Sequence, residues 1–258
     1  MKFYSYLLAF IVIFIFGADI FYTVSPYELN PSQILQPPSL EHIFGTDRLG
    51  RDLFARIIAG GKTSLIIGFI SALITSLIGL IIGITAGYFK GVVDKSIVII
   101  IDLFLTFPTF FLLLSLVAYI DASILILIFV LSITSWMSMA RLIRSESFAI
   151  SNKPYIKILK LAKVSIWKII FKYYSVLLAP IFLVSFTFSV GGAILGESAL
   201  SFLGLGINPP QISWGSILSD GKNVIDIAWW ISFFAGFFIF IITFCLVQIS
   251  DYLQKYTK

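Results

Sequence analysis

Long apolar segments constrain this chain more than any other feature of its sequence. A helix that spans the hydrocarbon core of a membrane needs about 20 residues. Mostly apolar segments of this length lie at 4–24, 63–88, 97–119, 123–143, 173–198 and 227–249. Only 12% of the 258 residues are charged, whereas a soluble domain has roughly 25%. Such a chain cannot hide its apolar surface in its own core, so the sequence predicts an all-α membrane protein with six transmembrane helices.

The first apolar segment also has features of a signal peptide. Lys2 precedes it, and Gly17-Ala18 is an acceptable cleavage site. The apolar run nevertheless continues beyond that site to Val24. We therefore expect residues 4–24 to be retained as a membrane span.

The distribution of lysine and arginine predicts the orientation, because cytoplasmic loops of membrane proteins carry an excess of both. With the N-terminus in the cytoplasm, 13 of the 18 basic residues fall inside and 5 outside. The outside residues are Arg48, Arg51, Arg56, Lys62 and Lys222. We therefore expect both termini on the cytoplasmic side of the cell (inner) membrane. The net charge of +5 then reports topology and not a nucleic-acid partner.

One polar insert, residues 141–172, is large enough to be a working part. It holds eight of the 18 basic residues and one acid, Glu146. Apolar residues recur in it at helical spacing with lysines between them, which predicts an amphipathic cytoplasmic helix near 154–168 that begins at Pro154. The periodicity fits two roles equally well: a helix lying on acidic lipid headgroups, or a docking helix for a partner protein.

Residues 25–62 form the first external segment. We divide the chain after them, so that 1–62 holds the first helix and this segment, and 63–258 holds the main transmembrane domain. Helical periodicity begins at Arg48, with Arg48/Asp52 and Asp52/Arg56 as i,i+4 pairs, which predicts a short amphipathic helix at the outer interface. That helix does not explain the clustered residues Gly45, Asp47, Gly50, Arg51 and Asp52.

The third span carries two candidates for a transport path. Pro108 predicts a kink in the helix. Asp102 is an acid at membrane depth, and such a residue faces protein or water rather than lipid. Asp102 is therefore either a structural partner for a basic residue or part of a substrate path.

Residues 191–215 are too rich in glycine and proline to predict a plain helix. Irregular backbone at membrane depth is tolerated where it is buried in protein or lines a water-filled cavity. The segment is therefore either an external loop folded over the bundle or an outer gate with Glu197 beside the pathway. The gate candidates are Glu197, Ser201, Gly204 and Gly206.

Residues that could carry chemistry are scarce. The sequence GGKT at 60–63 resembles part of a phosphate-binding loop, but the required earlier glycine would fall at Arg56. The single histidine, His42, and the single cysteine, Cys245, leave too few soft ligands for a transition-metal site. We therefore expect neither an enzyme nor a directly bound cofactor or metal.

Several stretches taken together point to one family. They are HIFGTDRLGRDLFARIIAG, GITAGYFKGVVD, DLFLTFP, ARLIRSESFAI and GGAILGESALSFLGLGINPPQISWGSIL. Over about residues 40–255 the chain resembles the C-type subunit of the dipeptide/oligopeptide/nickel branch of binding-protein-dependent ABC transporter permeases. The resemblance implies a type I importer fold with six helices. It also implies a homologous second permease, two cytoplasmic ATPases that use ATP, and an extracytoplasmic substrate-binding protein.

The resemblance decides between the two roles left open for the basic insert, because in this family the ATPase docks against a cytoplasmic helix that falls inside it. The implied docking residues are Tyr155, Ile158, Leu159, Ala162 and Lys163. This sequence departs from the family motif, whose Glu-Ala-Ala falls on residues 157–159 (KIL) and whose glycine falls on Lys163. Either the cognate ATPase has adapted to a basic helix, or coupling is weak.

The implied function is that of a permease subunit of an ATP-driven importer, which forms a translocation path with a second permease for di- or oligopeptides or nickel. The scarcity of histidine and cysteine favours peptides. The alternative is a self-sufficient secondary carrier or channel. A carrier would need its own coupling-ion site and often shows inverted repeats, and neither is evident in the sequence.

Overall fold

The computed structural model describes residues 2–118 and 123–257, where the regular elements are helices. The α-helices are α1 (Lys2–Gly17), α2 (Leu53–Phe89), α3 (Gly91–Thr106), α4 (Thr109–Val117), α5 (Ile124–Ser151), α6 (Pro154–Leu161), α7 (Ile166–Ile169), α8 (Ser175–Phe202), α9 (Trp214–Lys222) and α10 (Trp229–Thr257). Short 3-10 helices follow α1 at Ala18–Ile20 and Pro31–Gln33, and a π-helical turn, Ile170–Tyr174, joins α7 to α8.

The apolar helices agree with the predicted number of spans. Within residues 2–118 and 123–257, five helical stretches are long and apolar enough to cross a membrane, and α3 with α4 makes a sixth that is bent by 76°. The bend lies at Phe107 and Pro108, where the kink was predicted. The end of the third predicted span and the turn that follows, residues 119–122, lie outside the described residues.

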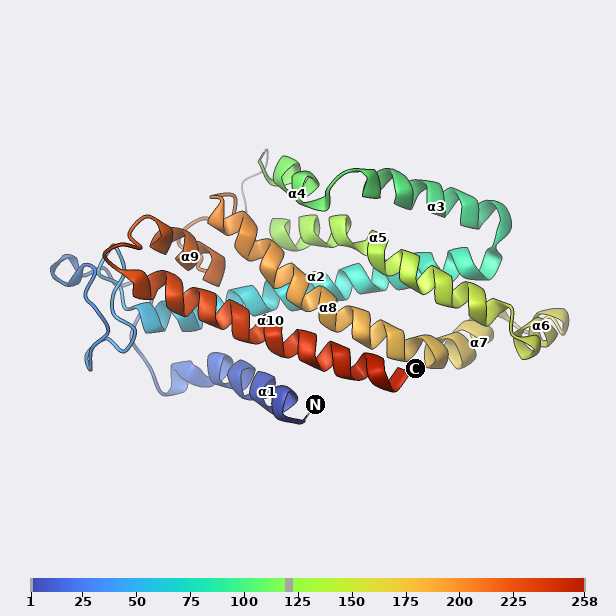
Figure 1. Ribbon diagram of the computed structural model, residues 1–258, viewed down its shortest axis with the longest axis horizontal. Helices are drawn as coiled ribbons and strands as arrows, with labels where there is room; N and C mark the ends of the chain where they lie inside the picture. Colours follow the sequence, from blue (N-terminus) through green and yellow to red (C-terminus); the bar gives the residue numbers. More distant parts are fainter. Residues whose placement is uncertain (1, 119–122, 258) are drawn as a thin grey trace.

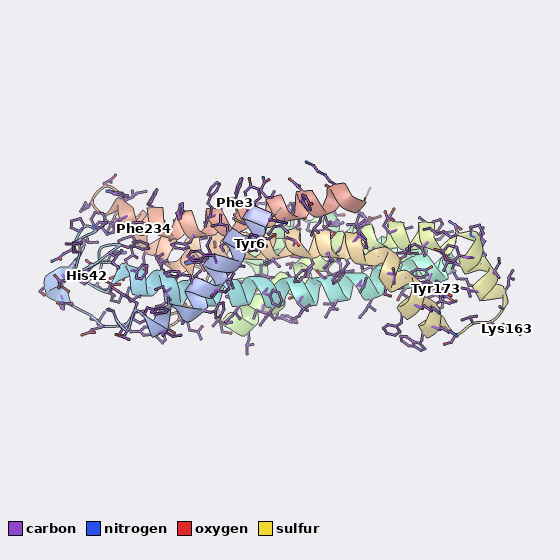
Figure 2. All side chains as sticks on the ribbon, turned by 90° about the horizontal axis from the view of Figure 1, so that it is seen from below. Phe3, Tyr6, His42, Lys163, Tyr173 and Phe234 are labelled. Carbon is purple, nitrogen blue, oxygen red and sulfur yellow. The ribbon has the colours of Figure 1, made fainter. Side chains whose placement is uncertain are left out.

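The long helices form an elongated bundle with short elements at both ends (Figure 1). One end carries α6 and α7, and the other carries α9 and the loops of residues 18–52. Figure 2 shows Lys163 at the first end and His42 at the second. The first end holds the basic insert, so we call it the cytoplasmic end and the second the outer end. The terminal ends of α1 and α10 both point toward the cytoplasmic end, as predicted (Figure 1).

α2 packs along α5 and α8 and organises the bundle. Its glycines allow α5 to approach closely: a Cβ on Gly79 would lie 2.6 Å from Met139, and one on Gly83 would lie 2.7 Å from Ile143. At the outer end, the fully buried Trp214 of α9 donates its ring N–H to the main-chain oxygen of Ile57 at 2.9 Å. These contacts fix α9 on the helices below it.

The short interfacial helix predicted from Arg48 does not form. Asp52 has an extended backbone and caps α2, accepting a hydrogen bond from the N–H of Ala55 at 2.8 Å. α2 then runs without a break for 37 residues, across the domain boundary that we placed at residue 62. The predicted i,i+4 partners also differ, because the carboxylate of Asp52 binds Nδ1 of His42 at 2.9 Å instead.

The glycine-rich segment is more regular than predicted. α8 continues as a helix through Gly191, Gly192 and Gly196 as far as Phe202, and irregular backbone is confined to residues 203–213. A glycine costs an exposed helix only about 1 kcal/mol, and packing against α2 and α10 outweighs that cost. The glycines lower the intrinsic helix propensity of this segment, but its tertiary contacts keep it helical.

Candidate functional site

α6 lies at the cytoplasmic end with one face inward and one outward. Ile156 is fully buried, and Leu159 and Val164 pack beside it against the bundle. The outward face exposes Tyr155, Ile158, Leu161, Ala162 and Lys163. Leu159, predicted on the docking face, therefore points the other way. The apolar stripe seen in the sequence is divided between the two faces of the helix.

The single helix predicted near 154–168 ends early, at Leu161. Lys163 has a left-handed backbone, with φ of 53°, and the chain turns there before α7. The N–H of Lys163 bonds the carbonyl of Lys160 at 3.1 Å, and the N–H of Val164 bonds the carbonyl of Leu159 at 3.1 Å. This pair of hydrogen bonds is the Schellman arrangement, which usually has glycine at the left-handed position.

Lys160 fastens α6 to the bundle. Its ammonium donates to the carbonyl of Tyr88 at 3.1 Å and to the hydroxyl of Ser151 at 2.9 Å, and it lies 3.7 Å from the centre of the Tyr88 ring. Burial, together with the charge of Lys90, lowers the pKa of Lys160. The sequence analysis treated this lysine as part of an exposed face. Its spacing of four residues from Ile156 is the signal that could have placed it inward.

Two ion pairs join α3 to α5. Arg144 donates two hydrogen bonds to Asp94, from Nε to Oδ1 and from Nη2 to Oδ2, the second at 2.7 Å. Arg141 contacts Asp102 through Nη2 and Oδ1 at 2.5 Å, and both side chains are more than half exposed. Asp102 therefore has the basic partner that we considered for it. The partners are far apart in the sequence, so no local pattern could identify them.

Glu197 is fully buried, and its carboxyl does not reach an open surface of the chain. Its oxygens accept hydrogen bonds from the hydroxyls of Ser201 at 2.7 Å and Ser64 at 3.2 Å. Ser64 in turn accepts from the N–H of Trp214 at 3.1 Å. Glu197 thus links α8 to α2 and α9. Glu197 therefore lies beneath the surface of the chain, and its place beside the pathway stays a prediction.

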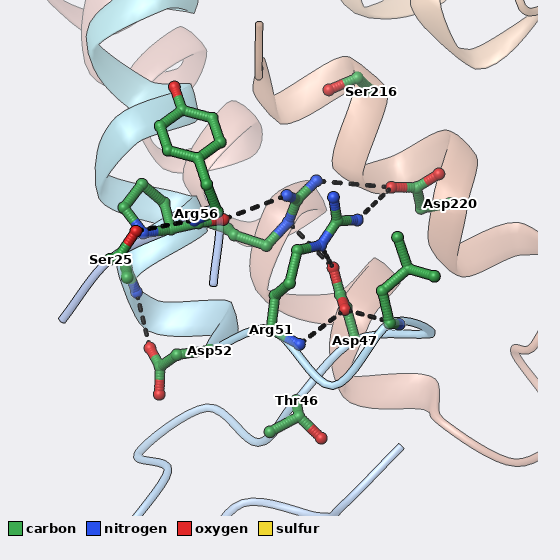
Figure 3. Close-up of polar contacts among 12 residues, drawn as sticks. Ser25, Thr46, Asp47, Arg51, Asp52, Arg56, Ser216 and Asp220 are labelled. Atoms are coloured by element: carbon green, nitrogen blue, oxygen red, sulfur yellow. Dashed lines mark hydrogen bonds and ion pairs between the residues drawn. The ribbon is translucent and has the colours of Figure 1, made fainter. Parts of the chain in front are cut away.

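The clustered glycines and charges of the external segment build a folded loop (Figure 3). Asp47 accepts from Nε of Arg51 at 2.7 Å and pairs with Nε of Arg56 at 3.1 Å, and both arginines reach Asp220 of α9. Gly45 and Gly50 both have positive φ, and a Cβ on Gly45 would clash with a main-chain oxygen 2.5 Å away. The cluster of glycines and charged residues at 45–52, which the predicted amphipathic helix did not explain, therefore holds the outer loop against α9.

Beside this loop lies a half-open cleft of about 730 Å³. Three of the four predicted gate residues, Ser201, Gly204 and Gly206, line it with the two arginines of the loop. The fourth, Glu197, lies beneath it. The structure thus brings the predicted gate and the predicted external segment together at one opening.

Residues 79–258 match the sequence model of a family described as binding-protein-dependent transport system inner membrane components. The chain belongs to this family. It is a multi-pass inner membrane protein and a permease subunit of an ABC importer, not an enzyme.

Curated relatives cover most of this permease. It is 33% identical over 250 residues to the oligopeptide transport system permease protein OppC of Haemophilus influenzae. That match covers 96% of this chain and 80% of the relative. It is 35% identical over 254 residues to the dipeptide transport system permease protein DppC of Bacillus subtilis. That match covers 95% of this chain and 78% of the relative.

A solved structure of the MetNI methionine ABC transporter in an inward-facing conformation has a similar fold. The TM-score is 0.59 at 14% identity, and the match covers 78% of this permease and 97% of that chain. The likeness supports the type I importer fold that the motifs implied.

The family resemblance bears on the backbone conformation of Lys163. In the family motif that the resemblance implies, glycine stands at the position of Lys163. The structure keeps the left-handed turn at that position. A lysine therefore adopts at this position the left-handed backbone that glycine adopts most readily.

Proposed function

We propose that this permease moves di- or oligopeptides into the cell through a path that it forms with a homologous second permease. Two ATPase subunits hydrolyse ATP at the cytoplasmic end, and an extracytoplasmic binding protein delivers the peptide at the outer end. This subunit itself binds no nucleotide in the proposal. The observation that carries it is the similarity, over 95–96% of the chain, to relatives named as oligopeptide and dipeptide permeases.

The outward face of α6 is the docking surface for an ATPase. Of the residues implied by the family motif, Tyr155, Ile158, Ala162 and Lys163 lie there, and Leu161 takes the place of Leu159. Ile158 is 63% exposed and Leu161 is 83% exposed. Adjacent apolar side chains this exposed on a cytoplasmic surface are typical of an interaction site.

The outer cleft is the side on which the binding protein docks. Gly204 and Gly206 line it, and the folded loop with Gly45, Asp47, Gly50, Arg51 and Asp52 lies beside it. We also assign Asp102 and the broken span at Pro108 to the path, because both interrupt the apolar third span. Glu197 supports the cleft from below through its serine partners.

The proposal is tested by ATP-driven uptake in proteoliposomes. The reconstituted complex of both permeases, the ATPases and a loaded binding protein is expected to accumulate a radiolabelled dipeptide, and to stop when ATP is withheld. Matched vesicles receive nickel instead. Nickel uptake without peptide uptake would show that nickel, and not a peptide, is the substrate. Peptide transport by this chain alone would show that it is a self-sufficient carrier.

A further inference from the structure

α7 presents two exposed rows of side chains at the cytoplasmic end of the bundle. Trp167 and Phe171 are 67% and 70% exposed, and their rings stack with centroids 6.1 Å apart. Lys168 and Lys172 are also exposed, and each directly follows one of these aromatic residues. The proposed docking face of α6 includes neither row, because the chain turns at Lys163 before α7 begins.

The backbone continues the outward side of α7 into α8. In the π-helical turn Ile170–Tyr174 the hydrogen bonds join residues five apart. Ile169 and Tyr174 have this spacing and are both fully buried. Phe171 and Val176 have the same spacing and are 70% and 69% exposed. The exposed aromatic row of α7 therefore leads into the exposed apolar surface of a membrane span.

α7 lies at the cytoplasmic edge of this span. Lys172 directly precedes the span predicted at 173–198, and no charged residue follows it before Glu197. Trp167 is within about 9 Å of residue 173 along the helix. Tryptophan is enriched at this depth, where its ring lies among the lipid headgroups. α6 lies farther out along the bundle than α7, so the two helices meet different surroundings (Figure 1).

The lysines of α7 have no acidic partner in the part of the chain that the structure describes. No aspartate or glutamate occurs between Glu146 and Glu197, and the ion pairs of the described residues include neither Lys168 nor Lys172. Lysines beside the cytoplasmic leaflet are attracted by its anionic lipids. Aromatic side chains next to lysines are also typical of a helix that lies in the interface plane.

We propose that α7 and the π-helical turn form a binding site for anionic phospholipid of the cytoplasmic leaflet. Trp167 and Phe171 enter the headgroup region, and Lys168 and Lys172 bind the headgroup phosphates. The inference goes beyond peptide transport and does not rest on it. The basic insert then serves two partners, because α6 contacts the ATPase and α7 contacts the membrane.

Fluorescence quenching by lipids tests this assignment in the assembled complex in nanodiscs. On a Cys245→Ala background, an aromatic fluorophore is attached at Trp167→Cys. The nanodiscs contain increasing mole fractions of phosphatidylglycerol or phosphatidylcholine, each spin-labelled near the glycerol. Half-maximal quenching is expected at a roughly 5–30-fold lower mole fraction of phosphatidylglycerol, which is the effect of one or two lysines at an anionic surface. Leu161→Cys, on the outward face of α6, is the control and is expected to be quenched by neither lipid.

Two double variants test whether the lysines of α7 cause the preference. Lys168→Gln with Lys172→Gln is expected to bring the two quenching curves together while both lipids still quench the fluorophore. Lys153→Gln with Lys157→Gln removes the same charge from α6 and the residue before it. This second variant is the matched control and is expected to keep the preference for phosphatidylglycerol.

Three results would overturn the inference. If neither lipid quenches the fluorophore at residue 167, α7 is covered by protein, with the ATPase as the candidate. If both lipids quench it equally, the contact is with the membrane in general and no anionic headgroup site exists. If both double variants lose the preference equally, the total charge of the insert and not α7 attracts the lipid. Peptide uptake enters none of these measurements, so a failure of the proposed transport function is seen separately.

Discussion

Lys160 of α6 donates a hydrogen bond to the carbonyl of Tyr88 at 3.1 Å and covers the ring of the same tyrosine at 3.7 Å. Tyr88 is the second-last residue of α2, which continues without a break to Leu53 at the outer end. A helix of 37 residues is about 55 Å long. The proposed docking helix is therefore bound directly to the helix that reaches the outer end of the bundle.

This link predicts the effect of removing the ammonium. Lys160→Met keeps the side-chain length but loses two hydrogen bonds and the cation–ring contact, which loosens α6 by roughly 1–3 kcal/mol. Stimulation of ATP hydrolysis by the loaded binding protein is expected to fall, while the ATPases still copurify. Lys157→Met, at an exposed position on the same helix, is the control. Equal loss of stimulation in both variants would mean that charge rather than the link matters.

The left-handed turn at Lys163 predicts a stabilising substitution. A residue with a Cβ pays about 1–2 kcal/mol in this conformation, so Lys163→Gly is expected to stabilise the turn, and Lys163→Val to destabilise it. Hydrogen exchange of the Val164 amide reports the change, since that N–H closes the turn. Faster exchange in Lys163→Gly than in the unsubstituted protein would contradict the account.

The burial of Glu197 changes what its substitutions are expected to do. Glu197→Gln keeps an acceptor oxygen for the serine hydroxyls, so near-normal transport and stability are expected. Glu197→Leu leaves buried hydroxyls unsatisfied, at a cost of about 1–3 kcal/mol each. The melting temperature of the purified complex and peptide uptake are measured together. If the Glu197→Gln complex is normally stable but its peptide uptake is strongly reduced, Glu197 takes part in transport directly.

The outer cluster predicts unequal roles for its two acids. Asp47 is 2% exposed and contacts two arginines, one of which, Arg56, is only 5% exposed. Asp47→Ala leaves that buried charge poorly compensated and is expected to cost roughly 3–5 kcal/mol. Asp220 is 43% exposed, with contacts of 3.6 and 3.9 Å, so Asp220→Ala is expected to cost less than about 1 kcal/mol. Thermal unfolding of both variants measures the difference, and equal losses would show that Asp47 does not organise the loop.

The features that could be predicted are those encoded in runs of neighbouring residues. Apolar length predicted the six spans, and Pro108 marked the break between α3 and α4. The orientation that the lysine and arginine distribution indicates stays a prediction. The motifs near 45–52 and 197–214 identified the family.

The features that could not be predicted depend on contacts between distant residues. Local propensity favoured irregular backbone at Gly191, but packing keeps α8 helical there. Periodicity alone placed Leu159 and Ile158 on one stripe, and only the position of the bundle shows that they face opposite ways. Asp102 pairs with Arg141, 39 residues away, and Glu197 accepts from Ser64, 133 residues away, in addition to its near neighbour Ser201. The two distant partners are beyond the reach of any local pattern.

The central claim is that the outward face of α6 is where the ATPase docks. Burying one large apolar side chain there contributes about 1.5–3 kcal/mol, so Ile158 is expected to lie in close contact with the ATPase. The direct measurement is photo-cross-linking from a benzophenone attached at Ile158→Cys, on the Cys245→Ala background, in the assembled complex. Leu159→Cys, one residue away on the inward face, is the matched control.

The account predicts an adduct with the ATPase from Ile158→Cys and little or none from Leu159→Cys. It is contradicted if Ile158→Cys gives no adduct while the ATPase copurifies, or if the adduct forms from Leu159→Cys instead.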